Sequence, residues 1–190
     1  MTTTFKGVHS TCVSLAESIL ANGIRATQVG RAGSGVYLWS YVNDSTEAEH
    51  LAADWYEDQV AARAFERYPR QGRVLLYYEL DLEPHEVVNI NSTWHHELIR
   101  RNLGRGRGKA DISKAYDDHI HGISEHRLTK LGAPLKLVEA SLPVPNATRG
   151  RSSGAPLTVG ADAYIVLATG IPSLKLVDVI GMPWKGKDNG

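Results

Sequence analysis

The chain has 190 residues, 42% hydrophobic and 22% charged, which is the composition of one globular domain with a substantial core. Its 21 basic and 21 acidic residues cancel, which excludes a global electrostatic attraction to nucleic acid or membranes. The single Cys12 excludes an internal disulfide. No stretch reaches the ~18 apolar residues of a membrane span, so we expect a cytoplasmic protein with no membrane partner.

The first third of the chain alternates strand and helix patterns. Residues 4–9 predict a short strand that ends at His9. Apolar residues at helical spacing follow, and Gly23 is well placed to end that helix. Three glycines, Gly30, Gly33 and Gly35, then lead into an apolar run at 36–39 that predicts a buried strand.

A second helix should begin at Asp44, because Glu47 three residues later completes a typical helix start. An apolar stripe favours its continuation toward Phe65. Residues 74–80 are the clearest strand in the chain, and we expect 87–90 to pair beside it.

The remaining segments predict an α+β domain spanning 1–190, with sheets packed around a cleft. We expect a mainly helical insertion over 93–131 and a long irregular loop over 143–162. Further strands are predicted at 135–142, 164–167 and 174–180.

Four features of the first third occur together in a characteristic order. They are His9-Ser10-Thr11 at a strand end, Ile24-Arg25 after a helix, Gly35-Val36-Tyr37-Leu38 on the second strand, and Ser45 eight residues after Tyr37. This order resembles the NAD-binding half of ADP-ribosyltransferases of the diphtheria-toxin and poly(ADP-ribose) polymerase type.

The resemblance implies split β-sheets around an NAD cleft, with NAD as a substrate. It implies that His9 hydrogen-bonds ribose hydroxyls and that the backbone of Ser10, followed by Thr11, contacts the nicotinamide carboxamide. Arg25 would face the adenosine half. Tyr37 would stack on the nicotinamide ring, and Ser45 would hydrogen-bond the carboxamide.

A catalytic glutamate is common in this family just before a Tyr-Ile-Val strand, but Ala163 occupies that position here. Three explanations are open. Asp162 serves instead, which requires a bulge or loop end that turns it inward. Alternatively, the chain is of the His-Tyr-apolar type associated with mono-ADP-ribosyl transfer, or Ala163 is an introduced Glu→Ala change.

The resemblance implies a mono-ADP-ribosyltransferase, a toxin or defence effector with a possible neutralising antitoxin. An NAD glycohydrolase and an inactive NAD- or ADP-ribose-binding module are the alternatives. The acceptor is a macromolecule, with nucleic acid slightly favoured over protein. Candidate acceptor-binding cations are Arg105, Arg107, Lys109, Arg149 and Arg151. Histidines at 95–96 and 119–121 lack zinc spacing, so no metal is expected.

Overall fold

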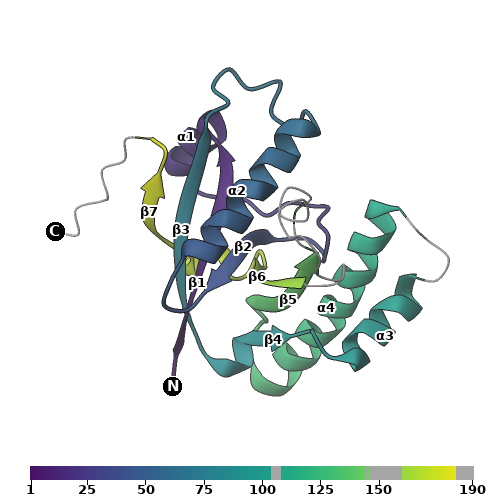
Figure 1. Cartoon of the computed structure of the whole chain (residues 1–190). Coiled ribbons are helices and arrows are strands. Elements are labelled where there is room, and N and C mark those ends of the chain that lie inside the picture. Colours follow the sequence, from purple (N-terminus) through teal and green to yellow (C-terminus); the bar gives the residue numbers. More distant parts are fainter. Residues whose placement is uncertain (104–107, 144, 146–159, 183–190) are drawn as a thin grey trace.

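Seven strands form one mixed sheet in this computed structural model, which describes residues 1–103, 108–143, 145 and 160–182. The strand order is β4-β5-β6-β2-β1-β3-β7 (Figure 1). The β4–β5 pair is parallel and the other pairs are antiparallel. The strands are β1 (Thr3–Cys12), β2 (Val36–Tyr41), β3 (Arg73–Leu82), β4 (Val87–Asn89), β5 (Leu137–Pro143), β6 (Gly160–Val166) and β7 (Lys175–Ile180).

Within the described residues, four α-helices cover the sheet unevenly. They are α1 (Val13–Asn22), α2 (Thr46–Ala61), α3 (Thr93–Leu103) and α4 (Lys109–Leu131). Helix α2 crosses one face of the sheet, α1 lies behind it, and α3 and α4 stand together to one side (Figure 1). Helices α3 and α4 lie within the range 93–131 that was predicted to be mainly helical. Among the helices of the described residues, none has the length and apolar character to span a bilayer.

Alternation along β2 separates two apolar cores. Tyr37 and Trp39 belong to a core shared with α2, α3 and α4, whereas Val36 and Leu38 belong to a second core shared with α1. Because successive side chains of a strand point to opposite faces, β2 supplies both cores and lies near the centre of the molecule.

Helix α2 is shorter than its apolar stripe predicts. It ends at Ala61 and not near Phe65, because Arg63 adopts a left-handed conformation with φ of 59°. The amide of Ala62 donates to the carbonyl of Asp58 in the last turn. Phe65 is still buried, and its ring stacks on Tyr56 at 5.2 Å.

The prediction that residues 87–90 pair beside β3 is wrong. Strand β4 is parallel to β5 at the opposite end of the sheet from β7. A 3₁₀ turn at Pro84–Glu86 separates β4 from β3 and carries the chain away. Apolar composition predicts that a strand exists, but its partner depends on contacts distant in sequence.

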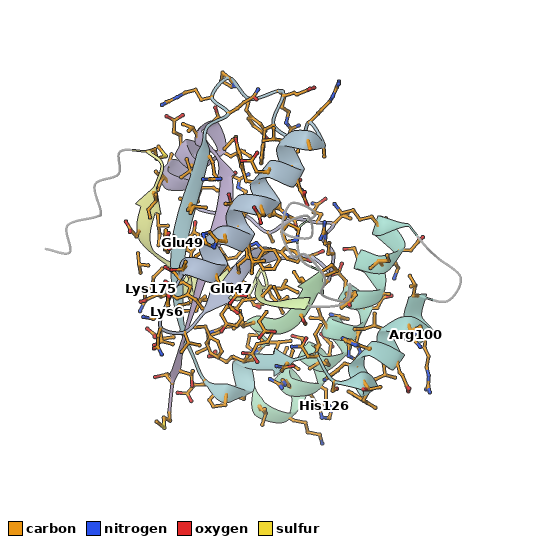
Figure 2. All side chains as sticks on the ribbon, viewed as in Figure 1. Lys6, Glu47, Glu49, Arg100, His126 and Lys175 are labelled. Atoms are coloured by element: carbon orange, nitrogen blue, oxygen red, sulfur yellow. The ribbon has the colours of Figure 1, made fainter. Side chains whose placement is uncertain are left out.

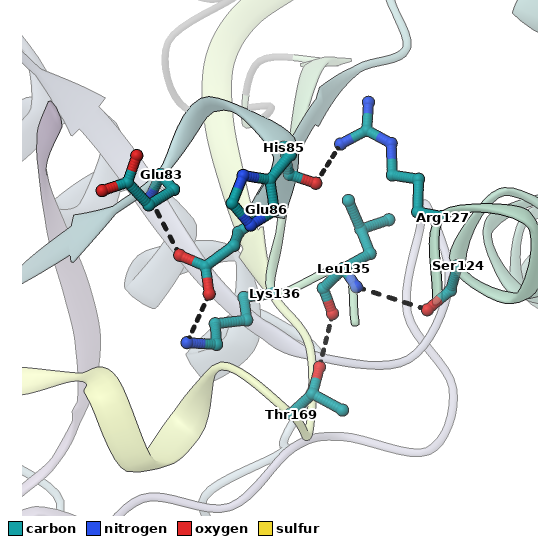
Figure 3. A network of polar contacts seen from close by, with 8 residues as sticks. All are labelled: Glu83, His85, Glu86, Ser124, Arg127, Leu135, Lys136 and Thr169. Atoms are coloured by element: carbon teal, nitrogen blue, oxygen red, sulfur yellow. Dashed lines mark hydrogen bonds and ion pairs between the residues drawn. The ribbon is translucent and has the colours of Figure 1, made fainter. Parts of the chain in front are cut away.

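A polar network fastens this turn and the C-terminal half of α4 to β5 (Figure 3). Arg127 donates to the carbonyls of His85 and Val87 at 2.7 and 2.6 Å. Lys136, next to β5, lies 2.6 Å from the carboxylate of Glu86. Helix α4 is therefore held to the sheet by side chain–backbone hydrogen bonds as well as by apolar packing.

The described strands form one continuous sheet, whereas split β-sheets were expected. Pairing between β1 and β2 nevertheless ends part-way along the two strands. The β1–β2 ladder stops at the Val8–Trp39 pair, while β1 continues pairing with β3 as far as Cys12. Residues 9–12 of β1 and 36–38 of β2 are therefore not paired with each other. This unpaired stretch, the β1–β2 opening, lies where the two strands that were expected to border the cleft separate.

Candidate functional site

The opening begins at His9, the residue after the last β1–β2 pair. Its Nδ1 lies 3.0 Å from the carbonyl oxygen of Tyr37, and its ring centre lies 6.4 Å from that of Trp55 on α2. A carbonyl only accepts hydrogen bonds, so Nδ1 of the neutral ring carries the proton. Nε2 is then left as an acceptor.

Burial lowers the pKa of His9, and the hydrogen bond to Tyr37 offsets this only in part. The imidazole is therefore neutral at pH 7. A neutral ring that presents Nε2 as an acceptor is suited to a hydroxyl donor, such as that of a sugar.

Tyr37 is held by the loop that precedes β2. Its hydroxyl donates to the carbonyl of Gly33 at 2.6 Å and accepts from the amide of Ala32 at 2.9 Å. A Cβ at Gly30 would lie 2.1 Å from the Tyr37 hydroxyl oxygen, so the backbone of Gly30 packs directly against it. Burial is the main cause that raises the pKa of Tyr37, which keeps the phenol protonated.

Ser10 and Thr11 are both 3% exposed and pair with Leu75 and Val74 of β3. The Ser10 hydroxyl makes no hydrogen bond within the described residues. Buried hydroxyl groups usually have a partner. Ser10 therefore places unused hydrogen-bonding capacity one residue beyond His9.

Ser45 lies at the start of α2 and is not brought to His9. Its hydroxyl donates to the carboxylate of Glu49 at 2.5 Å. Trp55, which does lie near His9, is ten residues further along the chain, or roughly 15 Å at 1.5 Å per helical residue. Burial and then Glu49 raise the pKa of the Tyr77 phenol.

Asp162 and Ala163 lie on β6 with opposite exposure. Ala163 is 2% exposed and pairs with Trp39 on one side and Ala140 on the other. Asp162 is exposed, and the β5–β6 register runs through it without a shift. The bulge that would turn the Asp162 carboxylate inward is therefore not found, and Asp162 lies on the face opposite to Ala163.

A hollow of about 300 Å³ lies between the start of α2, the end of β2 and the start of β6. Its lining includes Glu47, Tyr41 and Asp162. Figure 2 shows Glu47 and Glu49 near the start of α2, on the side of the molecule that carries Lys6. Tyr41 pairs with Lys6, three residues before His9, so this hollow lies roughly 10 Å along the sheet from the opening.

The cationic residues predicted to bind NAD or the acceptor either lie apart from one another or lie outside the described residues. Arg25 is exposed in the segment after α1, and Lys109 is exposed as the first residue of α4. Arg100, on α3, is likewise on the outer side of the helical pair (Figure 2). The other candidate acceptor-binding residues, Arg105, Arg107, Arg149 and Arg151, lie outside the described residues.

Two histidines from different helices, His95 of α3 and His119 of α4, meet between the two helices. Nδ1 of His95 lies 2.7 Å from Nε2 of His119, and Trp94 packs edge-on against His95 at 4.7 Å. Burial lowers the pKa of both imidazoles. Within the ranges that the structure describes, no three His, Cys, Asp or Glu side chains gather as possible metal ligands.

The sequence did not identify Trp55 and Glu49 as neighbours of the candidate residues His9 and Ser45. Trp55 was assigned to the apolar stripe of α2, and only its contact with His9 distinguishes it from an ordinary core residue. Glu49 follows Ser45 by one helical turn, which is a spacing at which side chains meet. That spacing could have signalled the Ser45–Glu49 contact.

Comparisons with models of protein families, with curated proteins and with solved structures found no match to this chain. The geometry of the β1–β2 opening and the order of its residues in the sequence are therefore the grounds for assigning a function.

Proposed function

We propose that this chain is an NAD-dependent mono-ADP-ribosyltransferase whose NAD site is the opening between β1 and β2. The observation that supports this most is the contact between His9 and Tyr37. Residues 28 positions apart in the chain meet through a 3.0 Å hydrogen bond at the point where the sheet opens. These are the two residues for which the sequence resemblance implies ribose binding and nicotinamide stacking.

The polar groups at the opening suit NAD. Nε2 of His9 accepts a hydrogen bond from a ribose hydroxyl. The unpartnered hydroxyl of Ser10 supplies a further donor and acceptor for the carboxamide or the ribose. Trp55 and Tyr37 offer aromatic surface beside these groups, and aromatic rings stack favourably on a planar ring such as nicotinamide.

The reaction breaks the bond between C1′ of ribose and the nicotinamide nitrogen. Nicotinamide leaves with the bonding electron pair, C1′ gains oxocarbenium character, and an acceptor nucleophile bonds to C1′ and loses a proton. The transition state resembles that of glycoside cleavage. His9 would orient the ribose and Tyr37 the ring, so that their contribution is mainly positioning.

The buried methyl group of Ala163 leaves the reacting ribose without a carboxylate from this position. A carboxylate there would stabilise positive charge that develops on the ribose. The absence of this carboxylate is compatible with two kinds of protein, which differ in whether NAD is consumed. If the chain is a complete enzyme, the other groups suffice for slow transfer. If it is an NAD-binding module, NAD binds and is not consumed.

We propose a macromolecular acceptor, with nucleic acid favoured over protein because the chain gathers five cations between residues 100 and 109. Replacement of Arg105, Arg107 and Lys109 by Ala should weaken acceptor binding. It should also reduce the slope of log affinity against log salt by about one for each phosphate group that the variant no longer binds. NAD affinity should not change in this variant.

The first test is NAD binding by calorimetry, with tryptophan fluorescence as a second readout because Trp55 borders the opening. The parent should bind NAD. Tyr37→Ala should bind it about two- to tenfold more weakly, since ring stacking contributes roughly 0.5–1.5 kcal/mol beyond burial. A parent chain that binds no NAD would refute the proposal.

The second test is incubation with labelled NAD and cell extract, followed by nuclease or protease digestion. Label that nuclease removes supports a nucleic acid acceptor, and label that protease removes supports a protein. Release of free labelled ADP-ribose without labelled macromolecule would identify a glycohydrolase. Binding without either product would identify a binding module.

A further inference from the structure

The glycine loop, residues 27–35, is fastened to the helical insertion by side chains of α4. The amide of Ser34 donates to Oδ1 of Asp117 at 2.6 Å, and the Ser34 hydroxyl donates to Oδ2 at 3.0 Å. One turn earlier on α4, the buried hydroxyl of Ser113 accepts from the amide of Gly30 at 3.2 Å. Asp117 therefore holds the loop with both carboxylate oxygens.

The contact between the glycine loop and α4 is close enough to require glycine. Gly33 has φ of 97°, a conformation that other residues rarely adopt. A Cβ at Gly33 would lie 2.8 Å from Oδ1 of Asp117. The carbonyl of the same Gly33 accepts the hydrogen bond from the Tyr37 hydroxyl.

Helix α4 is itself fixed at its other end. Arg127 bonds the backbone of residues 85 and 87, and the Ser124 hydroxyl accepts from the amide of Leu135 at 3.4 Å (Figure 3). A short chain of contacts thus runs from the sheet through α4 and Asp117 to Ser34, Gly33 and the Tyr37 hydroxyl.

We propose that Asp117 is a positioning residue for NAD, which acts by holding the glycine loop so that Tyr37 keeps its place at the β1–β2 opening. The inference rests on the proposed function, because it concerns the same NAD site. It makes the helical insertion part of the NAD site as well as a candidate acceptor surface. The Asp117 charge is also one of the causes that raise the pKa of Tyr37, which is consistent with their proximity.

The test compares Asp117→Ala, Asp117→Asn and Asp118→Ala. The first removes both carboxylate oxygens that accept from Ser34, whose hydroxyl keeps the carbonyl of Gln28 as an acceptor at 2.9 Å. The second keeps an oxygen that accepts from the Ser34 amide. The third removes an equal charge from the next residue, whose carboxylate pairs with Lys114 on the exposed side of α4. NAD affinity is measured by calorimetry, and the loop by hydrogen–deuterium exchange without NAD.

Asp117→Ala should weaken NAD binding about tenfold, because loss of the charged hydrogen-bond acceptor of Ser34 loosens the loop that holds Tyr37. It should also speed amide exchange over 27–35 about tenfold while exchange in α4 stays unchanged. Asp117→Asn should restore most of the affinity, and Asp118→Ala should match the parent. A folded Asp117→Ala that binds NAD as the parent does would overturn the inference.

Gly30→Ala is a second variant that leaves α4 intact and serves if Asp117→Ala does not fold. Its Cβ displaces the Tyr37 hydroxyl, so NAD binding should again weaken about tenfold. Unchanged affinity in this variant would equally overturn the inference. If the parent itself binds no NAD, the proposed function fails. Faster amide exchange of the loop in Asp117→Ala would then show only that Asp117 holds the loop.

Discussion

The two sides of the β1–β2 opening differ in how their hydroxyl groups are used. On the β2 side, the Tyr37 hydroxyl both donates and accepts within the glycine loop. On the β1 side, the buried Ser10 hydroxyl has no partner in the described part of the chain. The contrast separates two tasks. The Tyr37 hydroxyl is satisfied within the protein, whereas under the proposed function NAD would supply the partner that the buried Ser10 hydroxyl lacks.

The largest expected effect comes from placing a carboxylate at position 163, where the proposed NAD site has the methyl group of Ala163. Ala163→Glu should raise NAD hydrolysis or transfer about a hundredfold or more, the size of one transition-state hydrogen bond. The label experiment measures it, with Ala163→Gln as a control that matches size without charge. An NAD-binding, folded Ala163→Glu without gain, together with activity lost in Asp162→Asn, would assign the role to Asp162.

Tyr37→Phe should destabilise the protein. It removes the phenolic hydroxyl and leaves the Gly33 carbonyl and the Ala32 amide without their partner, which costs about 1–3 kcal/mol of unfolding free energy. Urea unfolding measures this value. An unchanged midpoint would show that the loop does not depend on the Tyr37 hydroxyl.

Ser10→Ala should have the opposite effect and stabilise the free protein by about 1 kcal/mol, because it removes a buried hydroxyl that has no partner. The same variant should bind NAD more weakly than the parent. Unfolding curves with and without NAD separate the two effects. A destabilised Ser10→Ala would mean that its hydroxyl is satisfied in the free protein, and the contrast between the two sides would be lost.

The smallest effect concerns acid. The pKa of His9 is lower in the folded chain than its ordinary value of 6.5, so the unfolded chain binds more protons near and below that pH. Stability should therefore decrease as pH falls below about 6.5. His9→Asn keeps a donor toward Tyr37 and should flatten this dependence in part, since the pKa values of His95 and His119 are lowered too. Urea unfolding across this pH range measures the effect, and substitution of the exposed His126 by Gln controls for removal of a surface imidazole. If the unfolding free energy of His9→Asn falls with pH as steeply as that of the parent, His9 does not contribute.

Local patterns predicted the elements well and their partners less well. The helix before Gly23 and the strand at 36–39 follow from periodicity and glycine placement, and both are present. Strand β4 was given the wrong neighbour, and α2 was extended too far, because a left-handed Arg63 has no clear sequence signal. Pattern alone therefore predicts segments better than their ends or pairings.

The site shows the same limit more strongly. His9 and Tyr37 were found through their order in the sequence. Asp117 was not, because it lies 83 residues from Ser34 and only the packing of α4 brings the two together. Asp162 was a candidate only if the strand had a bulge, and β6 keeps a regular register through it. A side chain that supports a site from a distant helix or strand leaves no recognisable pattern in the sequence around the site.

The position of β2 in the sheet has a consequence for the order of folding. Trp39 pairs with Val8, 31 residues away, and also with Ala163, 124 residues away. Closing a loop of the second length costs about 4 kcal/mol of chain entropy, against about 3 kcal/mol for the first. Contacts between distant residues slow folding, so the β1–β2 pair should form before β6 docks. Until then β2 has an unpaired edge, and such edges readily pair with other chains. During synthesis and refolding, this edge is where aggregation should begin.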